Sequence, residues 1–225
     1  MDELQNKNVL FETLRVRNGQ AEFVEEHLKR LQQSIGALGL KVKSGLSAAD
    51  ISNFLQQNAK SEKIYRLRVF ATEQGGRMSL EEYQPLEKKF YTEGISLLRV
   101  QHPDLHRARH KFWQRPAYRE LLASAERQGF HDALLCVGNE LLETATSNFF
   151  IVINNEIVVP PRGERLRGVM ERVILQKTKL RVREEKILWP LPENALCYIT
   201  SSLKGVVPVQ KIDDRFLLVF PFGEE

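Results

Sequence analysis

Alternating hydrophobic and polar residues predict strands in the first half of the chain. In the segment 9–16, Leu10, Leu14 and Val16 share one face of the predicted strand, and the charged Glu12 lies on that same face. The same alternation predicts further strands at residues 64–72, 77–83 and 95–101. The turn sequence Gln74-Gly75-Gly76 favours a hairpin between the predicted strands 64–72 and 77–83.

Helical periodicity separates these strands. Hydrophobic residues recur at steps of three and four between Val24 and Leu38, which predicts a helix over 21–38. Ser47 is a typical N-cap for a second helix over 47–57, and Pro116 suits the first turn of a third helix over 116–128. The stretch 102–114 has no apolar period and is predicted to be a loop.

The second half of the chain consists mostly of short hydrophobic runs. Strands are predicted at residues 133–137, 149–153, 156–159, 197–200, 206–209 and 216–220, with one helix over 169–178. Many short strands with few helices favour a closed or barrel-like sheet. We therefore expect an α+β protein with a soft boundary in the loop 102–109, which divides it into domains 1–105 and 106–225.

Composition excludes several classes of protein. With 42% hydrophobic and 28% charged residues the chain suits a globular fold rather than a disordered one. The net charge of +4 comes from basic residues that are interleaved with acidic ones and match no nucleic-acid-binding module, so no nucleic-acid partner is expected. No apolar run is long enough to span a membrane, and the polar, acidic start lacks a secretory signal, so we expect a cytoplasmic protein. Cys136 and Cys197 lie in apolar runs and are expected to be buried thiols.

Few residues indicate chemistry when they are taken singly. Lys111 precedes a predicted helix, Glu143 begins the polar stretch 143–148, and Arg30 lies on the first helix. The sequence Thr200-Ser201-Ser202 follows a strand. Each also has a non-catalytic interpretation. The three ionisable residues would be surface charges, and the hydroxyl cluster would stabilise a turn. No phosphate-binding glycine loop, metal-ligand spacing or nucleophile elbow is present, so composition and spacing alone predict only an α+β protein with a possible anion site and no metal.

Several segments taken together, however, resemble the fold-type IV pyridoxal-phosphate enzymes, the class IV aminotransferase family. The segments that carry the resemblance are Phe11–Val16, Glu26–Leu31, Lys111, Gly129–Leu135, Glu143–Phe150, Gly168–Arg172 and Ile199–Ser202. They occur in the family's order over residues 9 to about 212, and Lys111 and Glu143 lie 32 residues apart, as in the family. The family includes branched-chain aminotransferases, D-amino-acid transaminases and aminodeoxychorismate lyases.

The resemblance implies a fold and a cofactor. The fold would be that of D-amino-acid aminotransferase, with a small α+β N-terminal domain and a barrel-like mixed-sheet C-terminal domain. Pyridoxal 5'-phosphate would bind between the two domains. Lys111 would form the imine with the cofactor, a role that requires an uncharged amine and is favoured by cationic neighbours such as Arg107 and Arg109. His110 would also contribute, although a histidine is mostly neutral at pH 7.

The resemblance also assigns the remaining cofactor contacts. Glu143 would face the pyridine nitrogen and keep it protonated. Arg30 would bind the phosphate through its guanidinium, and the backbone amides of Val169 and Met170 would bind it at a helix N-terminus. Thr200 and Ser201 would complete the phosphate site, and Asn148 belongs to the same cofactor-binding set.

Differences from the family concern the substrate side. Only about ten residues precede Phe11, the family's glycine loop before that strand is absent, and the chain is short after Asp214. The segment Lys111–Arg115 resembles the lysine-to-arginine spacing of the lyases more than the pattern in branched-chain enzymes.

We therefore expect a 4-amino-4-deoxychorismate lyase, which releases pyruvate and forms 4-aminobenzoate for folate synthesis. Arg107, Arg109 or Arg115 would hold the carboxylates of this anionic substrate. The alternatives are a class IV aminotransferase acting on branched-chain or D-amino acids, and a non-catalytic homologue that binds the cofactor. By analogy with relatives, the protein is expected to be a homodimer.

Overall fold

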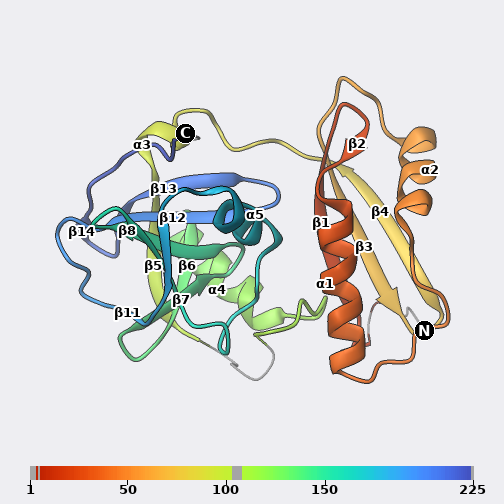
Figure 1. Ribbon diagram of the computed structural model, residues 1–225, viewed down its shortest axis with the longest axis horizontal. Coiled ribbons are helices and arrows are strands. Elements are labelled where there is room, and N and C mark those ends of the chain that lie inside the picture. Colours follow the sequence, from red (N-terminus) through yellow and green to blue (C-terminus); the bar gives the residue numbers. More distant parts are fainter. Residues whose placement is uncertain (1–3, 5, 103–107, 224–225) are drawn as a thin grey trace. The chain divides into compact units, whose positions relative to one another are not determined.

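A computed structural model describes residues 4, 6–102 and 108–223, and the chain divides into two units (Figure 1). The N-terminal unit comprises Met1–Pro85 together with His110–Arg115. The C-terminal unit comprises Leu86–Arg109 together with Pro116–Glu225. Each unit has its own sheet and its own hydrophobic core.

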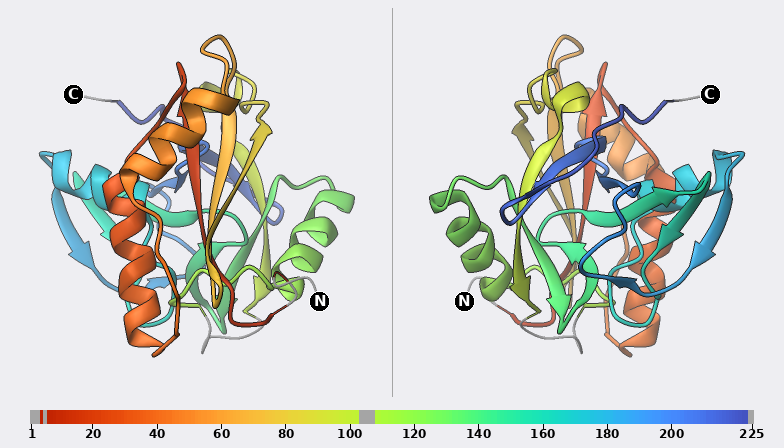
Figure 2. Two further views of the ribbon diagram at one scale, coloured as in Figure 1. Left: turned by 90° about the vertical axis from the view of Figure 1, so that its right-hand side faces the viewer. Right: turned by 90° about the vertical axis from the view of Figure 1, so that its left-hand side faces the viewer.

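The N-terminal unit is an antiparallel sheet with two helices on one face (Figure 2). In spatial order its strands are β2 (Gln20–Ala21), β1 (Leu10–Arg17), β3 (Tyr65–Thr72) and β4 (Gly75–Glu82), and its helices are α1 (Val24–Ala37) and α2 (Ala48–Asn58). Leucine, isoleucine and valine side chains from β1, β3 and both helices form the core. This burial is the main force that holds the helices on the sheet.

Local signals set the helix ends. Ser47 caps α2 as expected, because its hydroxyl accepts a hydrogen bond from the Asp50 amide while the Asp50 carboxylate accepts one from the Ser47 amide. Helix α1 begins at Val24, three residues later than the predicted start at residue 21. Gln20 and Ala21 are extended instead, because they pair with the end of β1 as β2.

The segment His110–Arg115 returns to the N-terminal sheet. The Phe11 amide donates to the Lys111 carbonyl at 3.0 Å, and the Trp113 amide donates to the Val9 carbonyl at 2.8 Å. Phe112 packs into the core formed by the helices and the sheet. Alternation along the chain therefore places Lys111 and Trp113 on the other face of the sheet, the face that carries Phe11.

The C-terminal unit is built around a closed ring of strands. In the order of pairing, the ring consists of β8 (Asn148–Ile153), β12 (Leu196–Ser201), β13 (Gly205–Ile212), β5 (Ile95–Gln101), β6 (Asp132–Val137) and β7 (Glu140–Thr144), and β7 pairs back to β8. The pairs β13–β5 and β5–β6 are parallel and the others are antiparallel. This ring confirms the expected barrel-like mixed sheet.

Further elements extend the barrel. They are the strands β9 (Glu156–Val159), β10 (Arg181–Glu184), β11 (Ile187–Leu188) and β14 (Arg215–Phe216), and the helices α3 (Phe90–Glu93), α4 (Pro116–Arg127) and α5 (Val169–Lys177). Helix α4 packs along β6, and α5 packs along β12. Both cysteines are buried free thiols, as expected, and burial raises the pKa of Cys197 to about 12.

The division of the chain differs from the predicted one at residue 105. Strand β5 lies between β13 and β6 in the barrel, so the C-terminal unit already begins at Leu86. The predicted strand over 216–220 is wrong, because only Arg215 and Phe216 pair with β13. Strand β7 was not predicted, although it closes the barrel.

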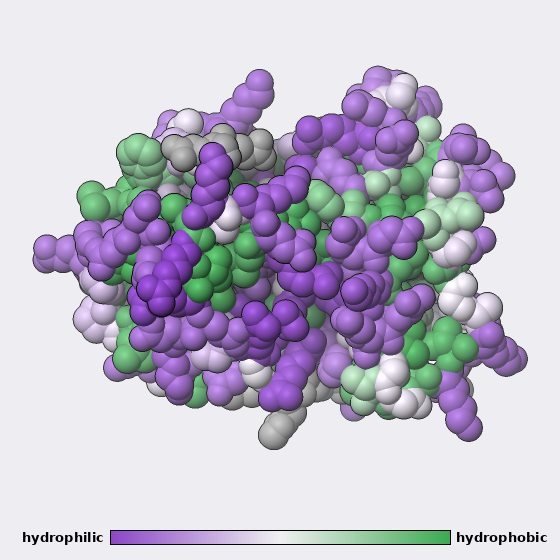
Figure 3. All heavy atoms as spheres, in the orientation of Figure 1, coloured by the Kyte–Doolittle hydropathy of each residue, from purple (hydrophilic) through white to green (hydrophobic). Residues whose placement is uncertain are grey.

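Hydrophilic residues cover much of the face in Figure 3, and hydrophobic residues form smaller groups between them. The large hydrophobic side chains that remain exposed include Phe216, Leu218 and Phe220, which follow the last long strand. None of the described helices is both long and apolar enough to cross a membrane.

Candidate active site

Lys111 lies beside strand β1 in the N-terminal unit. Its side chain is half-buried, and its Nζ atom lies 4.8 Å from the centre of the Phe11 ring. Trp113, on the same face, meets Phe11 edge-on with 5.3 Å between ring centres. The amine therefore lies against an aromatic face rather than in bulk water, which is the environment that an imine-forming lysine requires.

Arginines extend this aromatic face. The guanidinium carbon of Arg68 lies 5.3 Å from the centre of the Trp113 ring, a cation–π arrangement. Arg68 pairs directly with Thr13 across the β1–β3 ladder, so Thr13 also belongs to this face. Arg66 and Arg68 both form ion pairs with Glu81 on β4. Two guanidinium groups thus share one carboxylate, and a net positive charge remains on this face.

The other face of β1 carries a buried polar group. Glu12 is only 1% exposed, although it lies between the core residues Leu10 and Leu14. Arg30 on α1 donates to it twice, from Nε to Oε1 at 2.8 Å and from Nη2 to Oε2 at 2.5 Å. The His27 Nδ1 atom lies 2.7 Å from the same Oε2. Arg30 is therefore a half-buried, oriented cation and not a fully solvent-exposed helix charge.

Charge and burial fix the protonation states in this cluster. Burial alone would raise the pKa of Glu12, but the charge and hydrogen bonds of Arg30 and the hydrogen bond with His27 outweigh it and lower this pKa to about 2. Burial lowers the pKa of His27, and the positive charges of Arg30 and Lys111 lower it further against the opposing effect of Glu12. At neutral pH Glu12 is ionised and His27 is neutral, so His27 donates its Nδ1–H to Glu12.

His110 lies next to Lys111 in the sequence and contacts the same helix as Arg30. Its Nδ1 atom lies 3.0 Å from the Ser34 hydroxyl oxygen on α1. Three polar residues of α1, His27, Arg30 and Ser34, thus contact either β1 or the segment that bears Lys111.

In the C-terminal unit, Glu143 lies near the end of β7. It is only 4% exposed, and its Oε2 atom accepts a hydrogen bond from the Leu166 amide at 3.2 Å. The alternative of a surface glutamate is therefore excluded. A protonated ring nitrogen is a group with which a buried carboxylate of this kind forms a charge-assisted hydrogen bond.

The start of α5 lies against the start of β8. The Asn148 Nδ2 group donates to the Leu166 carbonyl at 2.6 Å, and a Cβ atom added to Gly168 would lie only 1.9 Å from the Asn148 Oδ1 atom. Gly168 is the extended N-cap of α5, and as a glycine it supplies no side-chain cap to the helix. Only glycine allows this close approach, which leaves the first amides of α5, those of Val169 and Met170, without a cap from Gly168.

Thr200 supplies a hydroxyl beside this helix start. It pairs with Asn148 across the β8–β12 ladder and is fully buried. Within residues 4, 6–102 and 108–223, no hydrogen-bond partner reaches its Oγ1 atom. The neighbouring Ser201 hydroxyl accepts a hydrogen bond from the Lys204 amide at 3.3 Å. A buried hydroxyl next to uncapped helix amides fits a phosphate group, which accepts hydrogen bonds from both.

A second buried carboxylate supports this end of the barrel. Asp132 is fully buried at the start of β6 and accepts hydrogen bonds from the hydroxyls of Thr144 and Thr146. Lys204 donates to the Thr146 hydroxyl at 2.8 Å and lies 3.5 Å from Asp132. Lys204 therefore joins the turn after β12, the strand that ends with Thr200 and Ser201, to the turn after β7, the strand that contains Glu143.

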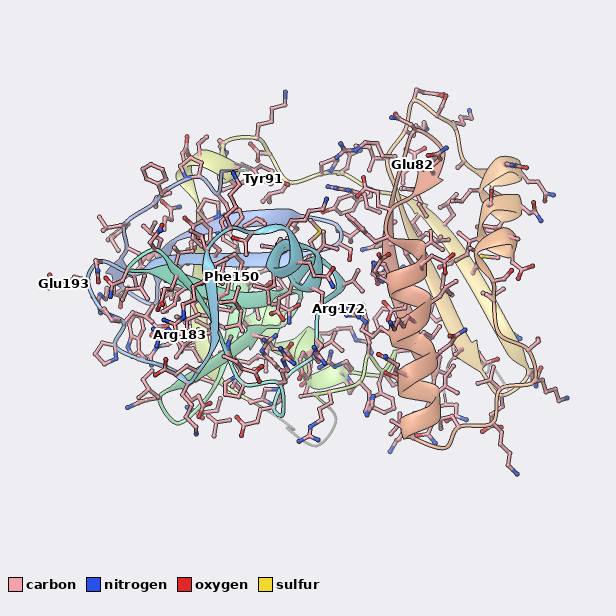
Figure 4. All side chains as sticks on the ribbon, viewed as in Figure 1. Glu82, Tyr91, Phe150, Arg172, Arg183 and Glu193 are labelled. Atoms are coloured by element: carbon pink, nitrogen blue, oxygen red, sulfur yellow. The ribbon has the colours of Figure 1, made fainter. Side chains whose placement is uncertain are left out.

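A buried ion pair supports the start of α5. Arg165 is 1% exposed, and it donates to Glu171 at 2.6 Å and to the Pro160 carbonyl at 2.9 Å. Burial raises the pKa of Glu171, and the charge of Arg165 opposes that rise. Arg172, the next residue of α5, is labelled on this helix in Figure 4. Because Arg165 precedes Gly168 and Glu171 follows it, their ion pair holds the loop before α5 against the first turn of the helix.

The arginines proposed for substrate binding have separate surroundings. Arg109 is exposed, and its Nε group donates to the Gly163 carbonyl in the same unit. Arg115 is half-buried, and Arg107 lies outside the described residues. Their role toward substrate stays a prediction.

Comparisons with known proteins identify a family. The family model described as amino-transferase class IV matches residues 9–212. A protein from Rickettsia felis named "Probable branched-chain-amino-acid aminotransferase" is 26% identical over 91% of this chain and 77% of its own length.

Two solved structures have the same fold. One, from Legionella pneumophila and provisionally named as a 4-amino-4-deoxychorismate lyase, has a TM-score of 0.79 and 20% identity, and the match covers 94% of this chain and 85% of that one. The other, an aminotransferase from Brucella abortus bound to pyridoxal phosphate, has a TM-score of 0.77 and 24% identity over 93% and 83% of the two chains. The expected fold is thereby confirmed.

Proposed function

Because the chain belongs to the class IV amino-transferase family, and is thus a pyridoxal-phosphate-dependent enzyme, we propose that it is a 4-amino-4-deoxychorismate lyase. In this reaction the substrate loses pyruvate and becomes 4-aminobenzoate, a precursor of folate. The names of the relatives include both a lyase and aminotransferases, so the choice between these activities rests on residues of this chain.

The residues present fit pyridoxal phosphate. The buried Thr200 hydroxyl and the amides of Val169 and Met170, which Gly168 does not cap with a side chain, supply donors for a phosphate, and Ser201 follows Thr200 in β12. We propose that Arg30 of the N-terminal unit binds the same phosphate. Asn148 acts through the Leu166 carbonyl and the close contact with Gly168, and so holds the loop that presents these amides.

Two ionisable side chains take part in the chemistry. When bound, pyridoxal phosphate supplies a protonated ring that withdraws electrons from the carbon bearing the substrate amine. The Glu143 carboxylate would hold the proton on the ring nitrogen through a charge-assisted hydrogen bond. The Lys111 Nζ atom would hold the cofactor, and its amine would serve as the general base that takes a proton from the substrate ring.

The surroundings of Lys111 favour the lyase. Its face of the sheet combines the rings of Phe11 and Trp113 with Arg66 and Arg68, which share the single carboxylate of Glu81. A flat, cyclic substrate with two carboxylates matches aromatic walls and excess positive charge. A branched-chain amino acid needs an aliphatic pocket for its side chain instead, and these side chains do not supply one.

Covalent labelling tests the cofactor assignment. The purified protein should absorb near the wavelength of a lysine-bound cofactor, and borohydride reduction should fix the label on Lys111, as mapped by mass spectrometry. Lys111→Ala should take up no label. A preparation that stays colourless with added cofactor, or a label on another lysine, would contradict the proposal.

Product analysis separates the lyase from its alternatives. Incubation with 4-amino-4-deoxychorismate and no keto-acid acceptor should give pyruvate and 4-aminobenzoate in equal amounts. Amino transfer from branched-chain or D-amino acids to 2-oxoglutarate, without that release, would replace the lyase by a transaminase. Bound cofactor with neither activity would identify a non-catalytic homologue.

The assembly and location of the protein are further proposals. We propose a homodimer, by analogy with enzymes of this family, and a cytoplasmic location suited to a folate precursor. Light scattering should give twice the chain mass of 26.0 kDa, and a monomer that is active at all concentrations would refute the dimer.

A further inference from the structure

We propose that Glu12 is a positioning residue for the cofactor phosphate, which acts by holding the guanidinium of Arg30 in one orientation. This inference rests on the proposed function, since it assumes that Arg30 binds the phosphate. Glu12 does not touch the cofactor in this role. It determines where the N–H groups of Arg30 point.

The geometry of the contact supports an orienting role. Glu12 accepts from both Nε and Nη2 of Arg30, which is the two-point contact that fixes the plane of a guanidinium. With that edge bound to Glu12, the Nη1 group and the second Nη2 hydrogen are directed away from the carboxylate. An arginine with a single contact could rotate about its side-chain bonds, and ordering it when the phosphate binds would cost affinity.

His27 fixes the carboxylate in turn. It lies one helical turn before Arg30 on α1, and its Nδ1 group is 2.7 Å from the Glu12 Oε2 atom. Glu12 and His27 are each 1% exposed, so neither side chain can reach solvent to relax. His27 thus orients the Glu12 carboxylate, and the carboxylate in turn orients Arg30.

A purely structural role is the alternative. A buried carboxylate with an arginine partner could serve only to hold α1 on the sheet, as other buried ion pairs do. Both roles predict that loss of Glu12 weakens the fold. Only the positioning role predicts an effect that depends on the phosphate of the ligand.

The test compares pyridoxal phosphate with pyridoxal, which lacks the phosphate but still reacts with Lys111. Both affinities are measured by absorbance titration of the full chain. In Glu12→Gln, the amide NH₂ group would face an Arg30 donor, so the guanidinium must turn. We expect the affinity for pyridoxal phosphate to fall about tenfold or more and the affinity for pyridoxal to stay within about twofold.

Controls make the result specific. Glu25→Gln makes the same chemical change at an exposed position in the first turn of α1 and should alter neither affinity. Arg30→Met should lower the preference for the phosphorylated ligand, and adding Glu12→Gln to Arg30→Met should lower it no further. If Glu12→Gln does not fold, Glu12→Asp keeps the charge but withdraws the carboxylate, and it should lower the same preference.

The outcomes separate the two hypotheses. Equal losses of affinity for both ligands, or an additive effect in the double variant, would overturn the positioning role of Glu12. A wild-type chain that binds neither ligand would instead overturn the proposed function.

Discussion

At the scale of single residues, buried carboxylates organise the groups around them in both units. Glu12 accepts hydrogen bonds from Arg30 and His27, and Asp132 accepts hydrogen bonds from two threonine hydroxyls next to Lys204. Desolvation makes an unpartnered carboxylate costly, so each of them orders its neighbours as the chain folds. The residues that such a carboxylate holds become rigid before any ligand arrives.

Stability at acid pH should report on Glu12. Its pKa in the folded chain is about 2, against an ordinary value of 4.5, so its stabilisation is complete above pH 4.5 and is lost as the pH falls toward 2. The full contribution is on the order of 3 kcal/mol. In urea unfolding, the stability difference between wild type and Glu12→Gln should therefore shrink between pH 5 and pH 2.

His27 provides an internal check on that measurement. Burial lowers the pKa of His27, so the stability that comes from keeping this side chain neutral begins to fall once the pH drops below its ordinary pKa of 6.5. This pH is higher than the one at which the contribution of Glu12 begins to fall. Loss of stability from His27 should thus begin before that from Glu12. A stability difference between wild type and Glu12→Gln that stays constant over the acid range would contradict the assignment.

Thr200→Val should have opposite effects on the free and the loaded protein. The substitution keeps the shape of the side chain but removes a buried hydroxyl that has no hydrogen-bond partner in the described part of the chain. The cofactor-free protein should unfold at an equal or higher temperature, because an unsatisfied buried polar group is destabilising by about 1–3 kcal/mol. Affinity for pyridoxal phosphate should fall about tenfold, the value of one hydrogen bond to a charged group.

Calorimetry and titration of the same sample would check both effects. A lower melting temperature of the cofactor-free variant would show that the hydroxyl stabilises the fold by itself. An unchanged affinity would remove Thr200 from the phosphate site.

At the scale of elements, the start of α5 depends on Gly168. An alanine there would place its Cβ atom 1.9 Å from Asn148 Oδ1, and Asn148 cannot move away without losing its hydrogen bond to Leu166. We expect Gly168→Ala to destabilise the protein by about 1–3 kcal/mol and to lower the affinity for pyridoxal phosphate at least tenfold.

Gly36→Ala is the matched control for this substitution. Gly36 lies within α1, and apart from the adjacent residues and the helix's own backbone no atom of the described residues lies within 4 Å of the position that its Cβ would take. The substitution should stabilise the protein by about 0.5–1 kcal/mol, since alanine is the better helix former. Thermal unfolding of both variants gives the comparison, and a Gly168→Ala protein as stable as wild type would refute the close contact.

Local patterns predict the elements that carry their own signal. The alternation around Leu10 and Leu14, the cap at Ser47 and the start of α5 at Val169 all appear in the structure within a residue or two. Strand β7 has no such alternation, because both of its faces are buried in the barrel. The hydrophobic residues at 216–220 suggest a strand, but pairing with β13 stops at Phe216.

The residues of the candidate site likewise divide into those that the sequence predicts and those that only the structure reveals. Lys111, Glu143 and Arg30 come from the family resemblance, and the structure places each in a half-buried or buried position. Glu12 was visible as a charged residue within an apolar stripe, a signal that indicates a buried partner. Its pairing with Arg30 could not be inferred, because it depends on how α1 crosses β1.

At the scale of the whole molecule, long-range pairing determines the division of the chain. Strand β5 precedes the loop at 102–109, yet it pairs in parallel with β13, which begins more than a hundred residues later. The segment that carries Lys111 returns to β1. Neither the parallel β5–β13 pairing nor the antiparallel bridge between Leu10 and Phe112 leaves a local trace in the sequence, because each joins segments far apart in the chain.

The cofactor should stabilise both units at once. We propose that Lys111 and Arg30 of the N-terminal unit and Thr200 and the α5 amides of the C-terminal unit hold one molecule of pyridoxal phosphate. A ligand bound only to the folded state adds stability to every region that must be ordered to bind it. Hydrogen exchange of the loaded protein should therefore slow both in the segment 110–113 and in the first turn of α5.

Lys111→Ala keeps the phosphate donors but removes the covalent bond. In this variant the cofactor should still slow exchange at the start of α5, while protection in the segment 110–113 should largely disappear. Protection confined to one unit in the wild-type protein would mean that the two groups of residues do not serve the same ligand. The proposal of one shared cofactor would then be wrong, whatever the activity of the enzyme.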